Sequence, residues 1–225
     1  MAAPRGGTRE RILNAAEKLF AARGYEGTST RAIVAASGDT IGSVNYHFGS
    51  KEMLFREVVR RRFDVIADAR RAHYQEACAV AGPEGPSLEA VVEAVVSPYL
   101  ERALRGGKGW RAYTQVIAAM LNSPKIYSRT VSGLVNETAD EFIGWLAQAL
   151  PDADPGDIAF AYEFMIGSTV EAGVESTVDR VARFTDGRWS SNDFDAVTPR
   201  LVRFVTAGIA ALTEPKRAPG AGKKG

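Results

Sequence analysis

The sequence of 225 residues predicts an all-α protein in which a small N-terminal helix-turn-helix domain precedes a larger helical domain. Apolar residues recur at helical spacing along most of the chain, and breaks rich in Pro and Gly separate the periodic segments at 82–86 and 151–155. The segment 30–51 also divides into two short helices around a tight turn at Gly38. We find no convincing strand in the sequence.

The first four helices are expected over residues 8–23, 30–37, 40–48 and 51–81. In the first helix, the apolar residues follow the i, i+3, i+4 pattern of a single buried stripe: Ile12, Ala15, Ala16, Leu19 and Phe20. Gly24 ends this helix, and Gly38 can take the positive φ that the turn after the second helix requires. Thr40 and Ser50 can cap the third and fourth helices through their hydroxyl groups.

Five more helices are expected over residues 87–105, 110–121, 128–150, 155–179 and 192–213. Ser87 restarts the chain after a break, and Pro155 occupies a favoured first-turn position. The segment 181–191 is predicted to be irregular, and it could either close a pocket or cover the edge of a dimer. The tail 214–225 is rich in Pro, Gly and Lys and is expected to be disordered.

These elements divide the chain into a helix-turn-helix domain (1–50), a regulatory and dimerisation domain (51–213, beginning with the linking helix 51–81) and a tail (214–225). Residues 1–80 carry 13 Lys and Arg against 9 Asp and Glu, whereas residues 81–225 carry 15 against 18. A basic N-terminal part suits a nucleic-acid partner, because neutralising phosphates releases counterions. The acidic remainder is expected to face away from that partner.

Residues 9–54 resemble the N-terminal domain of the TetR (tetracycline-repressor) family of bacterial transcriptional regulators. The resemblance rests on the run R-E-R-I-L-N-A-A-E-K-L-F-A-A-R-G-Y-E-G-T-S and on the specific run Y-H-F-G-S-K-E-x-L at 46–54. It implies that the segment 40–48 is a recognition helix that enters the major groove of DNA. Two residues depart from the family pattern, since Asp39 replaces a small apolar residue and Asn45 replaces an aromatic residue. Both are expected to lie beside the DNA.

The resemblance and the side-chain chemistry together predict the residues that contact double-stranded DNA: Thr30, Arg31, Thr40, Ile41, Gly42, Ser43, Asn45, Tyr46, His47 and Lys51. Ile41 could meet a thymine methyl group, and Gly42 allows close approach to a base pair. Lys51 resembles a phosphate-contacting residue of the family. His47 does so as well, with packing against Phe48 as the alternative.

By resemblance, the second domain should form a homodimer that reads an inverted repeat, with its last two long helices packed against those of the partner. The residues predicted for this interface lie at helical spacing: Ser168, Ala172, Phe194, Leu201, Val205, Gly208 and Leu212. The alternative is that these apolar stripes face the core of their own chain.

The resemblance also implies a pocket for an unknown small-molecule effector. Aromatic residues and methionines, with polar groups to orient a ligand, are the candidates for its walls: Trp110, Tyr113, Gln115, Met120, Phe142, Trp145, Phe164, Met165 and Glu171. Such a pocket would favour an apolar or amphipathic ligand. The alternative is that these side chains form plain core.

Composition argues against several other classes of protein. Cys78 is the only cysteine, and His47 and His73 are the only histidines, which excludes an intrachain disulfide and a thiolate zinc site. The sequence shows no catalytic motif or dinucleotide fingerprint, so we expect neither an enzyme nor a cofactor. It also lacks a run of about 18 apolar residues and a secretory signal, so we expect a cytoplasmic protein without a membrane span.

The sequence therefore favours a homodimeric repressor that binds a palindromic operator and is released by a ligand. The alternative is a sequence-specific DNA-binding regulator without small-molecule input, controlled by its abundance or by a protein partner. An enzyme ranks third, because a catalytic constellation is missing.

Overall fold

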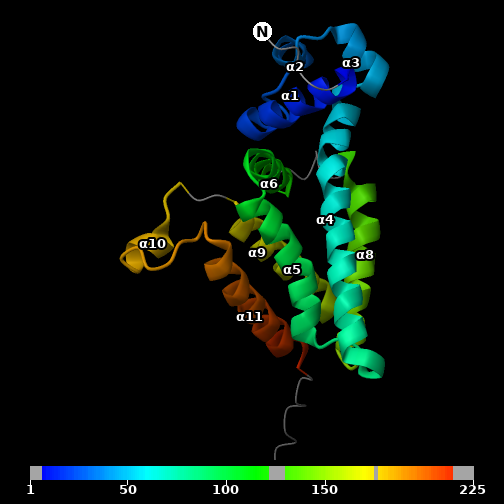
Figure 1. The fold of residues 1–225 in the computed structure, drawn as a ribbon. Coiled ribbons are helices and arrows are strands. Elements are labelled where there is room, and N and C mark those ends of the chain that lie inside the picture. The colour runs from blue at the N-terminus through cyan, green and yellow to red at the C-terminus, as the bar shows by residue number, and fades with distance from the viewer. Residues whose placement is uncertain (1–6, 122–129, 175–176, 215–225) are drawn as a thin grey trace, which may run out of the picture.

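The computed structural model describes residues 7–121, 130–174 and 177–214, and these residues form helices and turns without strands (Figure 1). The N-terminal unit consists of α1 (Thr8–Arg23), α2 (Thr30–Ser37) and α3 (Ile41–Phe48), which the long α4 (Lys51–Ala81) connects to the body. The 3-10 turn η1 (Gly82–Glu84) follows, and the described body consists of α5 (Leu88–Arg105), α6 (Lys108–Leu121), α8 (Ser132–Ala149), α9 (Pro155–Gly173), α10 (Arg180–Phe184) and α11 (Phe194–Thr213). The predicted all-α fold is confirmed.

The N-terminal unit is a three-helix bundle in which α1 packs against α2 and α3. Its apolar centre is almost fully buried and contains Ile12, Leu13, Ala16, Phe20, Ile33 and Val44. Gly38 has φ +74°, the left-handed value that the turn between α2 and α3 requires. The Thr40 hydroxyl accepts a hydrogen bond from the Ser43 amide at 3.1 Å and so caps α3, as predicted.

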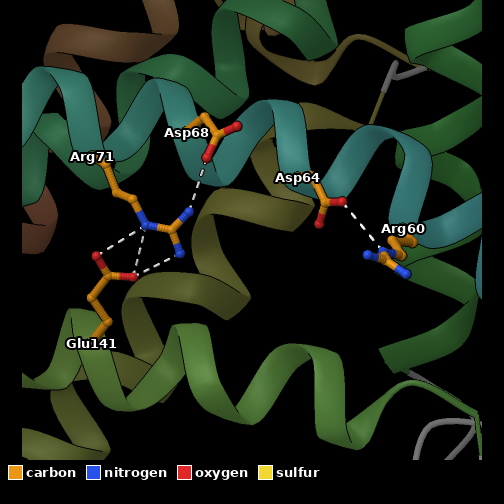
Figure 2. Close-up of polar contacts among 5 residues, drawn as sticks. All are labelled: Arg60, Asp64, Asp68, Arg71 and Glu141. Atoms are coloured by element: carbon orange, nitrogen blue, oxygen red, sulfur yellow. Dashed lines mark hydrogen bonds and ion pairs between the residues drawn. The ribbon is translucent and has the colours of Figure 1, made fainter.

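The helix α4 leaves the N-terminal unit beside α3 and continues along the body (Figure 1). Near its start, Phe55 meets Phe20 of α1 edge to face, with ring centroids 5.0 Å apart. Further along, the Arg71 guanidinium donates to both carboxylate oxygens of Glu141 on α8, at 2.8 to 3.1 Å (Figure 2). One continuous helix is therefore attached to both parts of the molecule.

The helix α5 lies at the centre of the body and packs against α4, α9 and α11. Most of its length is buried, including the apolar residues Val91, Val92, Ala94, Val95, Val96, Tyr99, Leu100 and Ala103. Pro98 lies inside this helix and lacks the N–H that would bond to the carbonyl oxygen of Ala94. The turn around Pro98 is therefore less completely bonded than the rest of α5.

The chain between α9 and α11 differs from the prediction. The helix α9 ends at Gly173 rather than near Asp179, and the segment predicted to be irregular contains the short α10. The Asp179 carboxylate orders the α10 segment, because it accepts hydrogen bonds from the Ala182 amide, the Ser190 hydroxyl, and both the amide and the hydroxyl of Ser191. These bonds, led by the one from Ser190, hold the pKa of Asp179 well below its ordinary value.

Other predicted boundaries are close to the observed ones. The final helix begins at Phe194 rather than at 192, and the helix predicted over 128–150 is seen from Ser132. The predicted start of that helix at 128 lies outside the described residues. So do 175–176 and the tail beyond 214, for which disorder is predicted.

By length and composition, α11 is the one helix in the described part of the chain that could cross a membrane. Core helices of soluble proteins pass the same test, so a single such helix is weak evidence. One side of α11 packs against α5 and α9. This packing accounts for part of its apolar stripe, because 33% of the stretch that passes this test is buried.

The ion pair between Arg11 and Asp39 holds the α2–α3 turn onto α1. Arg11 Nη2 lies 2.6 Å from Asp39 Oδ1, and the Asp39 side chain is only 6% exposed. The substitution Arg11→Leu removes this partner from a buried carboxylate, so the free energy of unfolding, measured by urea titration, should fall by about 2 kcal/mol.

The matched control is Arg9→Leu, because Arg9 pairs with Glu57 at the surface of the same unit. An exposed pair of this kind contributes at most about 1 kcal/mol, so this variant should lose less stability. Equal losses in the two variants would contradict the importance of the buried pair.

Candidate nucleic-acid interface and regulatory core

The helix α3, the predicted recognition helix, has one face toward the core and one toward solvent. Val44 is fully buried, whereas Gly42 and Asn45 are exposed and Tyr46 is 86% exposed. Ile41, at the start of the helix, is also exposed. The predicted base-contacting residues thus share an open face, which a helix needs in order to enter a major groove.

Hydroxyl groups and a helix N-terminus flank this face. Thr40 Oγ1 and Ser43 Oγ lie 3.0 Å apart, so the cap of α3 occupies part of the bonding capacity of both residues. At the start of α2, where Thr30 is half-buried, Ser29 rather than Thr30 is the cap and accepts a hydrogen bond from an amide at 3.1 Å. Arg31 is exposed beside this positive helix end, an arrangement that suits a phosphate.

His47 and Lys51 have contacts within the protein. The half-buried His47 ring lies 5.0 Å from the Tyr46 ring and 6.1 Å from the Phe48 ring, measured between centroids. The Lys51 ammonium lies 4.1 Å from the centroid of the Tyr25 ring, which holds it beside the loop after α1. Packing and phosphate contact are therefore both compatible with the position of His47.

Asp39 does not lie open to the DNA side, contrary to the expectation from the sequence. It turns back to α1 and pairs with Arg11, and its second oxygen, Oδ2, is buried without a hydrogen-bond partner among the described residues. The negative charge of Asp39, at a position where the family usually has a small apolar residue, is thus balanced by Arg11 inside the N-terminal unit. Sequence reasoning missed this pair because its members are 28 positions apart.

A buried carboxylate joins the N-terminal unit to the body. Glu17 on α1 is 4% exposed, and its Oε1 accepts a hydrogen bond from Arg62 Nε on α4 at 2.7 Å. The Arg62 guanidinium also lies over the Trp110 ring of α6, 4.8 Å from its centroid. A Cβ atom at Gly109 would lie only 2.6 Å from Arg62 Nη2, so this close approach favours glycine. Arg62 therefore bridges α1 and α6.

Trp110 lies at this junction, and its place in a ligand pocket stays a prediction. Its ring lies near two guanidinium groups, those of Arg62 and Arg102, the second 5.9 Å from the ring centroid. Gln115, which is also predicted for the pocket, is exposed on α6. Met120 lines a small cavity of about 210 Å³ between α6 and the loop after α1.

Four predicted pocket residues lie in the closed core of the body. Tyr113, Phe142 and Met165 are at most 1% exposed. Trp145 stacks on Tyr74 with ring centroids 4.1 Å apart, and its ring also lies 4.5 Å from that of Phe142. These contacts are those of a packed aromatic core.

Arg70 on α4 brings a guanidinium into this core. The residue is 7% exposed, and its Nε donates to the carbonyl oxygen of Val95 at 2.8 Å, close to Pro98 on α5. The guanidinium carbon lies 5.4 Å from the centroid of the Phe142 ring and 5.9 Å from that of Tyr99. Sequence reasoning missed Arg70 because arginine on a helix ordinarily faces solvent.

The chain compensates the charge of Arg70 only in part. Burial lowers the pKa of the guanidinium, while the nearby hydroxyls of Tyr162, Tyr113 and Tyr99 act to raise it. Burial raises the pKa of Tyr99 and Tyr113, so both hydroxyls stay neutral at physiological pH. Burying an ion costs on the order of several kcal/mol, and one hydrogen bond to a charged group returns about 1.5–3 kcal/mol. Among the described residues, no carboxylate bonds to Arg70.

The helices α9 and α11 leave an apolar face on the outside of the body. Phe160, Phe164 and Phe204 are 60%, 64% and 72% exposed. A groove of about 380 Å³ runs between the two helices, and four predicted interface residues line it: Ser168, Val205, Gly208 and Leu212. Phe160 was missing from the prediction, although its i, i+4 spacing to Phe164 indicates a shared apolar row.

Other predicted residues have different surroundings. Phe164 and Glu171, predicted for the pocket, are exposed on α9, Phe164 in the groove just described. Glu171, Ala172 and Leu201 line a second groove, of about 630 Å³, between the α10 segment and α11. Phe194, predicted for the dimer interface, lies under Arg105, the last arginine of α5, whose guanidinium carbon is 4.3 Å from the ring centroid.

Two family models match the chain. The model described as "Bacterial regulatory proteins, tetR family" matches residues 12–58. The model described as "Tetracyclin repressor-like, C-terminal domain" matches residues 93–208, about half of the chain. The two matches fall on the N-terminal unit with the start of α4 and on the body from α5 to α11.

Related sequences and structures agree with this assignment. The HTH-type transcriptional regulator LmrA of Bacillus subtilis is 43% identical over 74 residues, which are 32% of this chain and only 39% of LmrA. The HTH-type transcriptional repressor KstR2 of Rhodococcus jostii is 27% identical over 188 residues, which are 80% of this chain and 87% of KstR2.

Two solved structures share the fold at low sequence identity. A regulatory protein in the tetR family from Rhodococcus RHA1 has a TM-score of 0.60 at 19% identity, with 91% of this chain and 97% of that chain covered. The ketosteroid transcriptional regulator KstR2 of Mycobacterium tuberculosis has a TM-score of 0.57 at 18% identity, with 92% and 97% covered.

These matches confirm the resemblance inferred from the first helix and from the run at 46–54. They also confirm that the chain is a regulator rather than an enzyme, because the matched family consists of regulatory proteins. The helix-turn-helix unit and the helical body described above are the two parts that its family models recognise. This chain belongs to the TetR family of bacterial regulatory proteins.

Proposed function

We propose that this protein is a homodimeric transcriptional repressor that binds an inverted-repeat operator and releases it when a small apolar or amphipathic ligand binds in the body. The exposed face of α3, with Gly42, Asn45 and Tyr46 turned to solvent, is the observation that carries the proposal. The positive charge of residues 1–80 supports it, because neutralising phosphates releases counterions. The protein would act in the cytoplasm, where operator DNA lies.

The apolar face of α9 and α11 supports the dimer. In a two-fold dimer the same surface of the partner would cover Phe164 and Phe204, and the two copies of α3 would read the two half-sites. Ligand binding in the body would move α4 and change the separation of the two recognition helices. The protein would have one state that fits DNA and one state that does not. A ligand that binds the second state more tightly than the first would release the operator.

The close packing of Tyr113, Phe142 and Met165 favours a second candidate, a DNA-binding regulator without small-molecule input. Abundance or a protein partner would then control it. Native mass spectrometry of the protein titrated with apolar molecules separates the two candidates. A bound small molecule supports ligand control, and its absence supports the second candidate.

Selection of duplexes from a random DNA library, at two salt concentrations, tests the central proposal. We expect the bound pool to contain an inverted repeat with half-sites about one helical turn apart. Recovery of DNA without a common sequence, and only at low salt, would contradict specific operator binding.

The substitution Gly42→Ala tests whether α3 enters the groove. A Cβ atom at Gly42 would come no closer than 3.6 Å to the protein, so the fold accommodates the added methyl group. Against DNA the same methyl group should clash and weaken operator binding by about 1–3 kcal/mol in a fluorescence-anisotropy titration. The control is Gly133→Ala on α8, where the Cβ atom also has free space. Equal affinities of both variants and the native protein would exclude close approach at Gly42.

The substitution Phe164→Glu tests the dimer interface. A charge in the centre of a buried apolar interface should weaken association by about 2 kcal/mol or more and shift sedimentation equilibrium toward the monomer. Val80→Glu is the control, because Val80 is 85% exposed at the far end of α4. A dimer that tolerates the glutamate at 164 would place the interface elsewhere.

The substitution Arg62→Met tests the junction between the two parts. It removes the closest partner of the buried Glu17 and the contact with Trp110, so the free energy of unfolding should fall by about 1–3 kcal/mol. Hydrogen exchange of the α1 amides should become faster, because α1 loses a bond to α4. Arg56→Met, at an exposed position of α4, is the control and should leave both measurements unchanged.

A further inference from the structure

We propose that Arg70 anchors the carboxylate of an amphipathic organic acid inside the helical body. The acid would bring one negative charge to the buried guanidinium and an aliphatic or aromatic part to the surrounding rings. The regulatory consequence of this site rests on the proposed function above, whereas the binding itself does not.

The first argument is the state of the guanidinium. Arg70 is more than nine-tenths buried, and the structure records one hydrogen bond from it within the described residues, from Nε to the Val95 carbonyl oxygen. The guanidinium carbon lies over the rings of Phe142 and Tyr99. No hydrogen bond from either Nη atom is recorded among the described residues, and a carboxylate, a planar acceptor with two oxygens, matches the fork that these two atoms form.

The second argument is the neighbouring hydroxyl of Tyr99. The residue is 3% exposed, and its hydroxyl oxygen is buried without a hydrogen-bond partner in the described part of the chain. A buried hydroxyl without a partner is rare, because it has lost its hydrogen bonds to water and has formed none within the protein. Burial keeps the Tyr99 hydroxyl protonated, so it can donate to an anion but cannot itself neutralise Arg70.

The surroundings decide between kinds of anion. Aromatic and apolar side chains such as Phe142 and Met165 make up this core, together with neutral tyrosines. A phosphate dianion would bring more charge than one guanidinium compensates and more oxygens than these donors can bond. A monocarboxylate balances the charge, and its apolar part would pack against these rings, which have to separate to admit it because the core is closed in this structure. We therefore assign the site to an organic acid rather than to a phosphorylated ligand.

The position of Arg70 links this site to α3. Arg70 lies on α4, which begins directly after α3 and its turn, and it bonds to α5 at the centre of the body. An acid held by Arg70 on α4 and Tyr99 on α5 would favour one spacing of these two helices. It would thereby bias the position of α4 without touching the N-terminal unit.

Isothermal titration of the full chain with decanoate and with phenylacetate tests the proposal, with decanol and decylamine as uncharged and cationic comparisons. We expect at least one of the two carboxylates to bind the native protein at least about tenfold more tightly than decanol and decylamine. Arg70→Met should lose at least about tenfold in affinity for that carboxylate. Arg60→Met is the matched control, because Arg60 pairs with Asp64 at the surface of the same helix (Figure 2). The affinity of this variant for the carboxylate should equal that of the native protein.

The substitution Tyr99→Phe keeps the test decisive if Arg70→Met does not fold. It removes only a hydroxyl, so circular dichroism should stay native while carboxylate affinity falls about fivefold. The proposal is overturned if neither carboxylate binds the native protein, if decanol binds as well as decanoate, or if Arg70→Met and Tyr99→Phe bind as the native protein does.

A separate measurement of operator affinity distinguishes this proposal from the proposed function. If the carboxylate binds through Arg70 but leaves operator affinity unchanged at saturation, the anion site stands and ligand-controlled release fails. If the protein selects no operator yet binds the carboxylate through Arg70, the anion site again stands and the DNA-binding proposal fails.

Discussion

Burial of the Glu17 carboxylate is the constraint on which the arrangement of the two parts depends. A carboxylate removed from water needs a charged partner, and Glu17 has Arg62 of α4 at 2.7 Å. Arg62 is thereby held where it also covers Trp110. Three helices, α1, α4 and α6, meet at this one guanidinium. The N-terminal unit cannot turn on the body without separating these groups.

The same principle repeats along α4, where arginines at successive levels attach the helix to different neighbours. Arg62 connects it to α1 and α6, Arg70 to α5, and Arg71 to Glu141 on α8. A shift of α4 would lengthen several charged hydrogen bonds together. Its position should therefore change between discrete arrangements rather than continuously, which is the behaviour of elements that switch.

Local features were predictable and distant partners were not. The caps of α3 and α4 and the turn at Gly38 act on residues within a few positions, so the helices of the N-terminal unit could be placed from the sequence. The pair of Asp39 with Arg11, and the place of Trp110 in the junction, depend on residues far apart along the chain. Phe164 shows a different limit, because an apolar stripe has the same spacing whether it faces its own core or a partner. Arg70 continues the buried row of Ile66 and Tyr74 at i, i+4 spacing, but its charge predicts a solvent-exposed side chain, so the spacing alone did not reveal its burial.

The loop between α9 and α11 is fastened at its base, since the Asp179 carboxylate bonds both to Ala182 near its beginning and to Ser191 near its end. A loop closed in this way carries its own local order and transmits little strain to the helices that it joins. Its tip can lengthen, shorten or change sequence while α9 and α11 keep their places. The rim of the α9–α11 face can therefore diverge between relatives independently of α3. If this face forms the proposed dimer, two paralogues in one cell could keep similar operators and still avoid mixed pairs.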